Sequence, residues 1–300
     1  LSAIEKAEKW HGHLYNWMDI GTLRPICPLF VSSVDSGNLA ASLLVIQGHF
    51  KGGLGERAKK LLAEMDFSPL FDEEVKLFSI GMDCKSGKLS GSHYDLLASE
   101  ARLLSFVTIA LGTVDVSHWF RLARPLTAID GRRLLISWSG TMFEYLLPGI
   151  FTGSVKNTLL GESMANAVAV QRTAAKGTPW GVSESGYYAF DLSMNYQYRA
   201  FGLEGAGVRP TREERVIAPY ASALAAAEEP QAATENLRAL DELGARGKYG
   251  FYEALDFTPE RAGNGRRLVM SFMAHHVGMS LAAITNALCD GAVKNAFMSV

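Results

Sequence analysis

One stretch of the chain, Tyr94 to Leu111, reads YDLLASEARLLSFVTIAL. Its apolar residues fall at helical spacing, at Leu96, Leu97, Leu103, Leu104, Val107 and Leu111. Such spacing predicts a helix over 94–111 with a broad apolar face. Several stretches of this kind are apolar on nearly every side, and helices of that type must be covered on most faces.

Helical periodicity dominates the rest of the chain as well. The other expected helices are Asn38 to Gln47, Glu56 to Glu64, Thr141 to Leu147, Leu159 to Ala175, Gly186 to Phe201, Tyr220 to Glu228, Gln231 to Leu243 and Leu268 to Leu288. Strand-like stretches are few, and the best are Lys76 to Ile80 and Arg133 to Ser137. The sequence therefore predicts one all-α domain over 1–300. Its helices would form either an inner ring wrapped by an outer ring or a large irregular bundle.

Charge and cysteine content exclude several classes of function. A formal net charge of -2, with no run of Lys or Arg, gives no basic field for a nucleic acid. Cys27, Cys84 and Cys289 lie far apart, which argues against a disulfide framework and a thiolate metal site and fits a reducing compartment. No apolar run approaches the ~20 residues that cross a bilayer, so we expect a soluble segment. Because it begins with Leu, we expect it to be part of a longer chain.

The acidic residues fall into two groups according to their neighbours. Most lie in polar surroundings, as Glu213-Glu214 and Glu228-Glu229 do, and are expected at the surface. A smaller group lies in apolar, aromatic or small-residue stretches: Asp35, Asp95, Glu100, Glu144, Glu184 and Glu253. Since removing a lone carboxylate from water is costly, this group suggests a polar cavity lined by acids. The alternative for each single acid is a helix cap or a partner arginine.

Aromatic residues are concentrated between Trp180 and Phe201. Seven of these 22 residues are aromatic, whereas the overall frequency of 10% predicts about two. Tyrosine and tryptophan combine an apolar face with a polar tip, which suits the C–H faces and hydroxyl fringe of a pyranose. Stacking on these rings, with hydrogen bonds to acids and to Asn195, would bind a sugar. A helix that uses aromatic residues as core is the alternative.

Two adjacent histidines, His275 and His276, lie in the stretch MAHHVGM. Neighbouring side chains on a helix point about 100° apart, so this pair is poorly placed to share a metal ion. Walker and Gly-x-Gly-x-x-Gly patterns are absent from the sequence. We therefore expect no metal and no cofactor, and we expect one of the two histidines to reach the cavity as a hydrogen-bond donor.

Ordered blocks along nearly the whole chain resemble one known family. These blocks are Tyr15 to Trp17, Val34 to Leu39, Tyr94 to Arg102, Trp138 to Leu146 (WSGTMFEYL), Pro179 to Ser185 (PWGVSES), Asn195 to Gly202 (NYQYRAFG), Tyr249 to Ala254 (YGFYEA) and Met273 to His276 (MAHH). They are similar to the glucoamylase-like, ring-closing domain of cyclic β-1,2-glucan synthases. The chain departs from the family pattern at Met18, Ile20 and Val277.

This resemblance implies an (α/α)6 barrel that is incomplete at its N-terminus. Residues 1–130 would form its N-terminal half, and residues 131–300 would form the C-terminal half with the main motifs. The implied reaction is retaining transglycosylation that closes linear β-1,2-glucan into rings. The implied context is a longer, membrane-anchored chain at the cytoplasmic side of the bacterial inner membrane, with glycosyltransferase and phosphorylase-like domains.

The resemblance and position of the acids also suggest site residues. Glu100 is the expected acid/base and Glu184 the expected nucleophile, with Glu144 and Glu253 as further catalytic candidates. Residues expected to bind the glucan are Asp35, Tyr94, Asp95, Trp138, Tyr145, Trp180, Tyr187, Tyr188, Asn195, Tyr196, Tyr252, His275 and His276. The open alternatives are an endo-β-1,2-glucanase, a non-catalytic glycan-binding fragment, and a structural bundle whose acids are dispersed over the surface.

Overall fold

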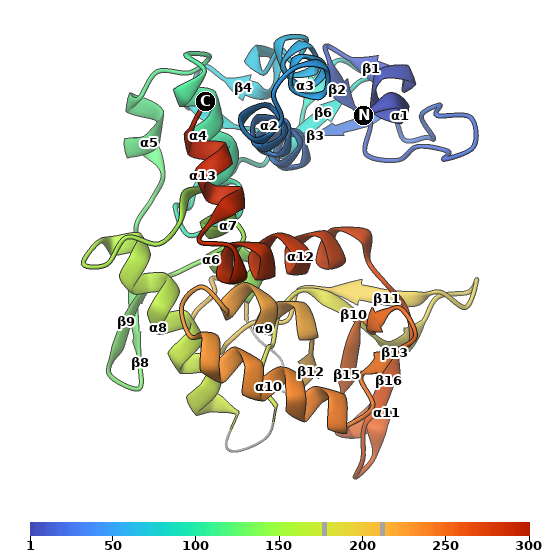
Figure 1. The fold of residues 1–300 in the computed structure, drawn as a ribbon, viewed down its shortest axis with the longest axis vertical. Coiled ribbons are helices and arrows are strands. Elements are labelled where there is room, and N and C mark those ends of the chain that lie inside the picture. Colours follow the sequence, from blue (N-terminus) through green and yellow to red (C-terminus); the bar gives the residue numbers. More distant parts are fainter. Residues whose placement is uncertain (176–178, 211–213) are drawn as a thin grey trace. The chain divides into compact units, whose positions relative to one another are not determined.

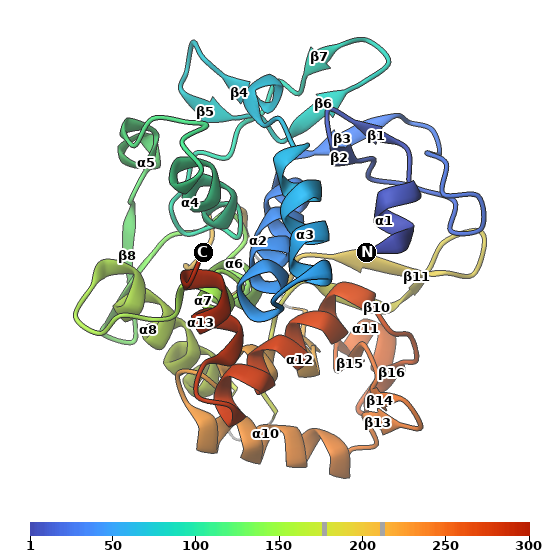
Figure 2. The same ribbon diagram turned by 45° about the horizontal axis from the view of Figure 1, so that its top comes forward.

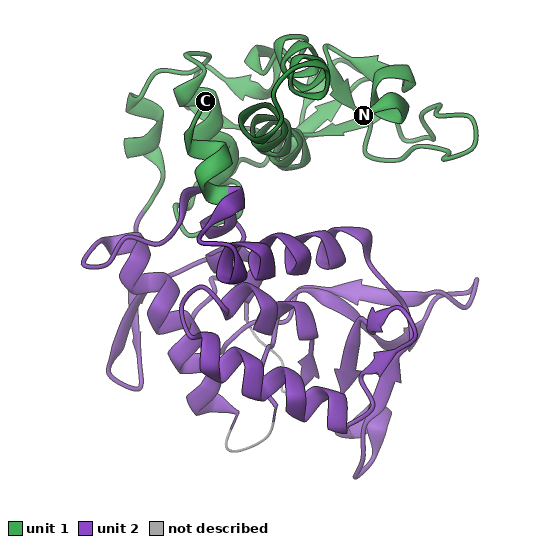
Figure 3. Cartoon of the chain, in the orientation of Figure 1, with its two compact units in different colours: residues 1–123, 294–300 green, residues 124–293 purple. Residues whose placement is uncertain are grey.

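Two compact units make up the chain (Figure 3). The computed structural model describes residues 1–175, 179–210 and 214–300, so Glu213 lies outside the described residues. Unit 1 contains Leu1–Ala123 and Lys294–Val300, and unit 2 contains Arg124–Val293. Outside the gaps at 176–178 and 211–213, none of the helices combines the length and apolar character that crossing a membrane requires.

Unit 1 combines helices with small antiparallel sheets. Its helices are α1 (Ser2–Lys6), α2 (Ser33–His49), α3 (Gly53–Ala63), a short 3-10 helix (Ser68–Leu70), α4 (Arg102–Ala110), α5 (Ser117–Arg121) and the end of α13 (Ala292–Met298). Its strands are β1 (Lys9–Trp10) with β2 (His13–Leu14), β3 (Phe30–Ser32) with β6 (Gly81–Asp83) and β7 (Lys88–Leu89), and β4 (Phe71–Asp72) with β5 (Leu77–Phe78).

The core of unit 1 forms where α2 packs against α3 and α4, which Figure 2 shows beside it. Close packing is possible because the buried face of α2 consists largely of small residues. A Cβ added to Gly37 would lie 2.5 Å from the Cβ of Leu104 on α4. Ser32 caps the start of α2 by accepting a hydrogen bond from the backbone N–H of Asp35.

Unit 2 contains the main motifs. Its helices are α6 (Met142–Leu146), α7 (Gly149–Thr152), α8 (Leu159–Ala174), α9 (Pro219–Ala225), α10 (Pro230–Glu242), α11 (Pro259–Ala262) and α12 (Ala274–Leu288). Its strands form the hairpins β8 (Leu126–Ile129) with β9 (Arg132–Leu135), β10 (Ser185–Phe190) with β11 (Tyr196–Arg199), and β13 (Arg246–Gly247) with β14 (Gly250–Phe251). A three-stranded sheet has the order β12 (Val216–Ile217), β15 (Ala254–Asp256), β16 (Arg267–Val269).

Helix α9 is the centre of unit 2. All seven of its residues are buried, and it packs against both α10 and α12 (Figure 1). Pro219 occupies its first turn, where the missing N–H costs no hydrogen bond. The sheet β12–β15–β16 supplies the apolar side chains of Val216, Leu255 and Val269. Helix α9 and this sheet therefore supply much of the buried centre of unit 2.

Most of the expected helices are confirmed, with somewhat different ends. These are the stretches predicted at 38–47, 56–64, 141–147, 159–175, 220–228 and 231–243. The strands expected near 76–80 and 133–137 are also present. The fold is mainly helical rather than all-α, because the described residues contain sixteen short strands, none longer than six residues.

The helix predicted for Gly186 to Phe201 is wrong. This segment is the antiparallel hairpin β10–β11. A turn separates its strands, in which Asp191 Oδ1 accepts hydrogen bonds from the N–H groups of Ser193 and Asn195. Tyrosine and phenylalanine favour strands when a turn of this type divides the run, so the aromatic residues belong to a hairpin.

Two further helices begin later than predicted. The helix expected from Tyr94 begins at Arg102, because Asp95 and Leu97 exchange backbone hydrogen bonds with Ala123 in extended conformation. The helix expected from Leu268 begins at Ala274, since residues 267–269 form β16 against β15.

Candidate functional site

A cluster of polar side chains in unit 2 surrounds the hydroxyl of Tyr198, on β11. Nε2 of His275 and Nε2 of His276 each lie 3.2 Å from this hydroxyl oxygen. The carboxylate of Glu184 also forms a hydrogen bond with the hydroxyl. The structure therefore brings together Glu184, His275 and His276, three of the residues singled out in the sequence.

Glu253 lies behind His276. Its Oε2 is 3.0 Å from Nδ1 of His276, and its Oε1 accepts a hydrogen bond of 3.0 Å from the backbone N–H of Gly186. The side chains of His276 and Glu253 are only 4% and 1% exposed. The ring of Tyr220 stacks on that of His276, with centroids 3.8 Å apart. Glu253 is thus enclosed by protein groups, and it orients His276.

The segment that carries Glu184 is held by buried polar side chains. Gln171 accepts from the N–H of Val182 at 2.9 Å and donates to its carbonyl at 2.7 Å. The hydroxyl of Tyr220 lies 2.8 Å from both the backbone carbonyl of Glu184 and Oγ of Ser183. These contacts hold the backbone of Glu184, which is a half-buried residue.

The electrostatics of the cluster keep Tyr198 protonated. Removal of its hydroxyl from water raises the pKa of Tyr198 far above its ordinary value of 10.0, and the negative charge of Glu184 raises it further. The residue as a whole is 38% exposed. Tyr198 is therefore a permanent hydrogen-bond donor beside a half-buried carboxylate.

Glu144, Tyr145 and Trp180 are placed in structural positions. Glu144 forms a capping box with Thr141 at the start of α6. The hydroxyl of Tyr145 donates to the carbonyl of Leu135 at 2.6 Å, and Tyr145 is 1% exposed. Trp180 is 7% exposed, and Asn236 bonds its backbone on both sides. These side chains present almost no surface to a ligand.

The hairpin aromatics fall into two groups. Tyr188 and Tyr196 pack with Phe190, and Asn195 lies exposed in the turn. Tyr187 packs against Phe201 and beneath the guanidinium of Arg199.

The two other aromatic candidates in unit 2 lie outside the hairpin. Trp138 lies beside Arg209, and Tyr252 packs against Phe272. A role of these two rings and of the hairpin aromatics in binding stays a prediction.

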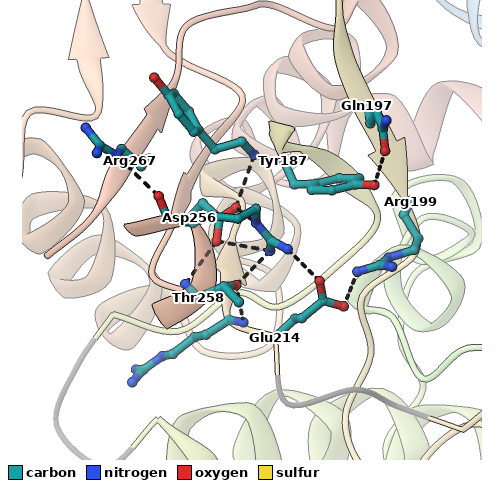
Figure 4. A network of polar contacts seen from close by, with 10 residues as sticks. Tyr187, Gln197, Arg199, Glu214, Asp256, Thr258 and Arg267 are labelled. Carbon is teal, nitrogen blue, oxygen red and sulfur yellow. Dashed lines mark hydrogen bonds and ion pairs between the residues drawn. The ribbon is translucent and has the colours of Figure 1, made fainter. Parts of the chain in front are cut away.

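A network of charged residues contacts the hairpin β10–β11 (Figure 4). Glu214 forms ion pairs with Arg199 on β11 and with Arg261 on α11. Arg261 also pairs with Asp256, whose side chain is 0% exposed. Glu214 was expected at the surface, and that expectation is wrong because its side chain is 14% exposed and paired twice. Glu228 is likewise half-buried, and burial raises the pKa of its carboxyl.

The remaining candidates belong to unit 1. Asp35 is exposed in the first turn of α2, and Tyr94 is half-buried with its N–H bonded to the carbonyl of Phe78. Oδ1 of Asp95 is buried and has no hydrogen-bond partner among the described residues. The carboxylate of Glu100 accepts from Ser99 Oγ at 3.3 Å. In the part of the chain that the structure describes, no three His, Cys, Asp or Glu side chains form a metal-binding group.

Comparison with known proteins identifies the family of the chain. A family model described as "Putative glucoamylase" (Glycoamylase) matches residues 92–300. The chain belongs to this glucoamylase family. The glucoamylase-like character expected from the sequence blocks is thereby confirmed, and the match includes Glu100 and the complete Tyr198 cluster.

Individual relatives of this glucoamylase-family chain carry names from β-1,2-glucan metabolism. The chain is 43% identical over 249 residues to cyclic β-(1,2)-glucan synthase NdvB of Rhizobium meliloti (strain 1021), which covers 81% of this chain and 9% of that protein. The fold resembles a β-1,2-glucanase from Parabacteroides distasonis, with a TM-score of 0.77, 16% identity, and coverage of 99% of this chain and 48% of that one. A variant endo-β-1,2-glucanase from Talaromyces funiculosus, in complex with β-1,2-glucan, has a TM-score of 0.71, 13% identity, and coverage of 89% and 60%.

Sequence reasoning missed Tyr198, Tyr220 and Ser183 as parts of the site. Tyr198 lies in the block NYQYRAFG, but the predicted helix gave no reason to single it out. If residues 185–199 are read as a hairpin, Tyr198 becomes a strand residue, and the alternation of side chains along a strand then places it on one face of the hairpin. Tyr220 follows Pro219 at a helix start, which is a recognisable signal.

Proposed function

We propose that this chain is a glycoside hydrolase-like domain that closes linear β-1,2-glucan into cyclic β-1,2-glucan with retention of configuration. The supporting observation is the half-buried carboxylate of Glu184 at the Tyr198 cluster. It occurs in a chain that is 43% identical to part of a cyclic β-(1,2)-glucan synthase. The chain spans only 9% of the length of that relative, so the activity of the whole protein is part of the proposal.

In the proposed reaction Glu184 is the nucleophile. Its carboxylate attacks the anomeric carbon, the glycosidic bond breaks, and the departing 2-oxygen takes a proton from the acid/base, leaving a glycosyl ester. The 2-hydroxyl at the far end of the same glucan then attacks the anomeric carbon. That hydroxyl gives its proton to the acid/base, the ester bond breaks, and the ring is released. Glu100 is the proposed acid/base.

The geometry favours Glu184 over the other candidates for the nucleophile. Both oxygens of Glu253 are engaged by Gly186 and His276 in a side chain that is 1% exposed. The oxygens of Glu144 accept hydrogen bonds from Ser137, Ser139 and Thr141. A carboxylate that attacks a sugar must reach it, and these two are enclosed by protein donors. We therefore propose structural roles for Glu144 and Glu253.

The wider architecture is also a proposal. A mainly helical fold in this family supports an (α/α)6 barrel, and the small share of the synthase that the chain spans supports further glycosyltransferase and phosphorylase-like domains in a longer chain. Such a chain would be anchored at the cytoplasmic side of the inner membrane. The partner of this domain would be the growing β-1,2-glucan.

Product analysis tests the proposal. The chain is incubated with linear β-1,2-glucan, and the products are examined by mass spectrometry and by a reducing-end assay. Cyclic products lack the mass of one water molecule relative to linear chains of equal length, and their formation creates no excess of reducing ends. Glu184→Gln should abolish the products while the fold, followed by circular dichroism, is retained. Glu235→Gln on the exposed side of α10 is the matched control and should leave activity unchanged.

Endo-hydrolysis of β-1,2-glucan is the second candidate function. The structural likeness to β-1,2-glucanases favours it. In that reaction water attacks the glycosyl ester, so each event creates one new reducing end. Linear products with a rising reducing-end count would favour hydrolysis over ring closure, and the absence of any product would reject both reactions.

A further inference from the structure

The hydroxyl of Tyr198 has three polar neighbours and only one proton. The neighbours are the carboxylate of Glu184 and the Nε2 atoms of His275 and His276, both at 3.2 Å. A phenol can donate one hydrogen bond and accept others at its oxygen. An ionised carboxylate only accepts, whereas an imidazole nitrogen either donates or accepts. The contact with Glu184 therefore requires the proton of Tyr198.

The environment of His276 supports this direction. Nδ1 of His276 faces the carboxylate of Glu253, which already accepts from the N–H of Gly186. Nδ1 must then carry a proton and donate a hydrogen bond to the carboxylate of Glu253. If Nε2 also carries a proton, it donates to the oxygen of Tyr198 and leaves the phenol proton for Glu184. If Nε2 lacks a proton, it competes with Glu184 for the phenol proton. Only in the first arrangement do His276, Tyr198 and Glu184 all have complementary hydrogen-bond roles.

We infer that Tyr198 holds Glu184 in its charged, attacking form by donating its hydroxyl proton, and that Glu253 is a positioning residue that acts through His276 to direct this proton toward Glu184. The kinetic part of this inference rests on the proposed function. The chain of contacts runs from Gly186 through Glu253 and His276 to Tyr198 and Glu184. Stacking of Tyr220 on His276 supports the orientation in which the imidazole contacts both Glu253 and Tyr198.

Removing one hydroxyl tests the role of Tyr198. Tyr198→Phe keeps the ring of a residue that is 38% exposed and removes only the hydroxyl donor. The titration of Glu184 is followed by NMR in protein with 13C-labelled glutamate carboxyls, and its signal is assigned by its loss in Glu184→Gln. Because a hydrogen bond to a charged group favours the charged form, the titration midpoint should rise by about 1–2 pH units in Tyr198→Phe. Tyr249→Phe, at an exposed tyrosine of the same unit, is the matched control and should leave the midpoint unchanged.

Activity on linear β-1,2-glucan gives the second readout. The acid-side midpoint of the kcat/KM profile should rise by the same interval, so activity well below both midpoints falls on the order of 10- to 100-fold, while the loss at about pH 8 is smaller. The titratable and charged groups that face Tyr198 are Glu184, Glu253, Tyr220, His275 and His276. A uniform loss at every pH would indicate a merely structural role.

The two readouts separate failure of the inference from failure of the proposed function. An unchanged Glu184 midpoint in Tyr198→Phe overturns the inference, whatever the activity. A raised midpoint in a chain that converts no β-1,2-glucan supports the role of Tyr198 and rejects the proposed substrate. A raised midpoint together with a displaced acid limb supports both.

Discussion

Nδ1 of His276 and the carboxylate of Glu253 lie 3.0 Å apart, and their side chains are 4% and 1% exposed. A buried carboxylate needs hydrogen-bond donors in place of water, and Glu253 has two of them, Nδ1 of His276 and the N–H of Gly186. Removing one partner is costly, because a buried polar group then remains unsatisfied. Because Nε2 of the same histidine contacts the hydroxyl of Tyr198, we infer that the pair orients His276 toward Tyr198.

The first prediction concerns Glu253→Gln. Replacing the carboxylate with an amide weakens the two hydrogen bonds that it accepts, from the N–H of Gly186 and from Nδ1 of His276, and should lower the free energy of unfolding by about 1–3 kcal/mol. The measurement is urea denaturation followed by circular dichroism. Glu229→Gln is the matched control, since Glu229 pairs with Arg172 at 41% and 43% exposure, and it should change the free energy by about 1 kcal/mol or less. Equal stability of the two variants would contradict the prediction.

The sequence predicted those parts of the structure that depend on local pattern. Helix α10 follows its apolar periodicity, begins at Pro230 and is followed by Gly244 with a positive φ of 81°. The role of Glu144 was also readable, because Thr141-x-x-Glu144 is a capping-box pattern. The aromatic run at 186–201 was ambiguous, since only the short turn at 191–195 separates a hairpin from a helix.

The polar contacts of the site could not be read from the sequence. Glu214 stands next to arginines in the chain, which suggested a solvated cluster, but its partners Arg199 and Arg261 lie 15 and 47 residues away. The contact between Tyr198 and His276 spans 78 residues. Tertiary packing brings these groups together, and periodicity carries no information on such pairings.

The second prediction concerns acid stability and Asp256. Burial raises the pKa of this carboxyl, but hydrogen bonds from Arg261, Thr258 and Tyr188 outweigh burial and lower it below the ordinary value of 3.8. A carboxyl with a lower pKa in the folded state stabilises the fold above its unfolded pKa. That contribution is lost as the pH falls through the folded pKa. The free energy of unfolding should therefore decline as the pH falls below about 4.

Asp256→Asn isolates this contribution. Its free energy of unfolding should decline less steeply than that of the wild type over the same acidic range, because one fewer proton is taken up on unfolding. The comparison uses urea denaturation at a series of pH values. Asp130→Asn changes an exposed carboxyl in the turn between β8 and β9 and serves as the control for the general effect of removing a negative charge. Parallel curves for Asp256→Asn and the wild type would show that the network does not bind protons differently in the folded state.

The third prediction contrasts two glycines of unit 2. A Cβ added to Gly202 would lie 1.6 Å from the carbonyl oxygen of Ser139, so Gly202→Ala should destabilise the fold by about 1–3 kcal/mol. A Cβ added to Gly278, within α12, meets nothing within 4 Å. Gly278→Ala should stabilise the helix by about 0.5–1 kcal/mol, because alanine loses less conformational freedom on folding. Thermal unfolding measures both, and the same sign for the two variants would refute the packing described for Gly202.

The last prediction assigns the two catalytic roles by the stereochemistry of chemical rescue. The substrate is a β-1,2-linked glucose oligomer that carries an aryl group in β configuration at its anomeric end. In Glu184→Gly, azide can enter the space of the missing carboxylate and attack the anomeric carbon that carries the aryl group. The aryl oxide leaves, and one displacement yields the glycosyl azide with inverted, α configuration. In Glu100→Gly, the aryl leaving group needs no acid, so Glu184 still forms the ester. Azide then displaces Glu184, and two inversions give the β-azide. Proton NMR of the anomeric signal distinguishes the products. An α-azide from the Glu100 variant and a β-azide from the Glu184 variant would exchange the two roles.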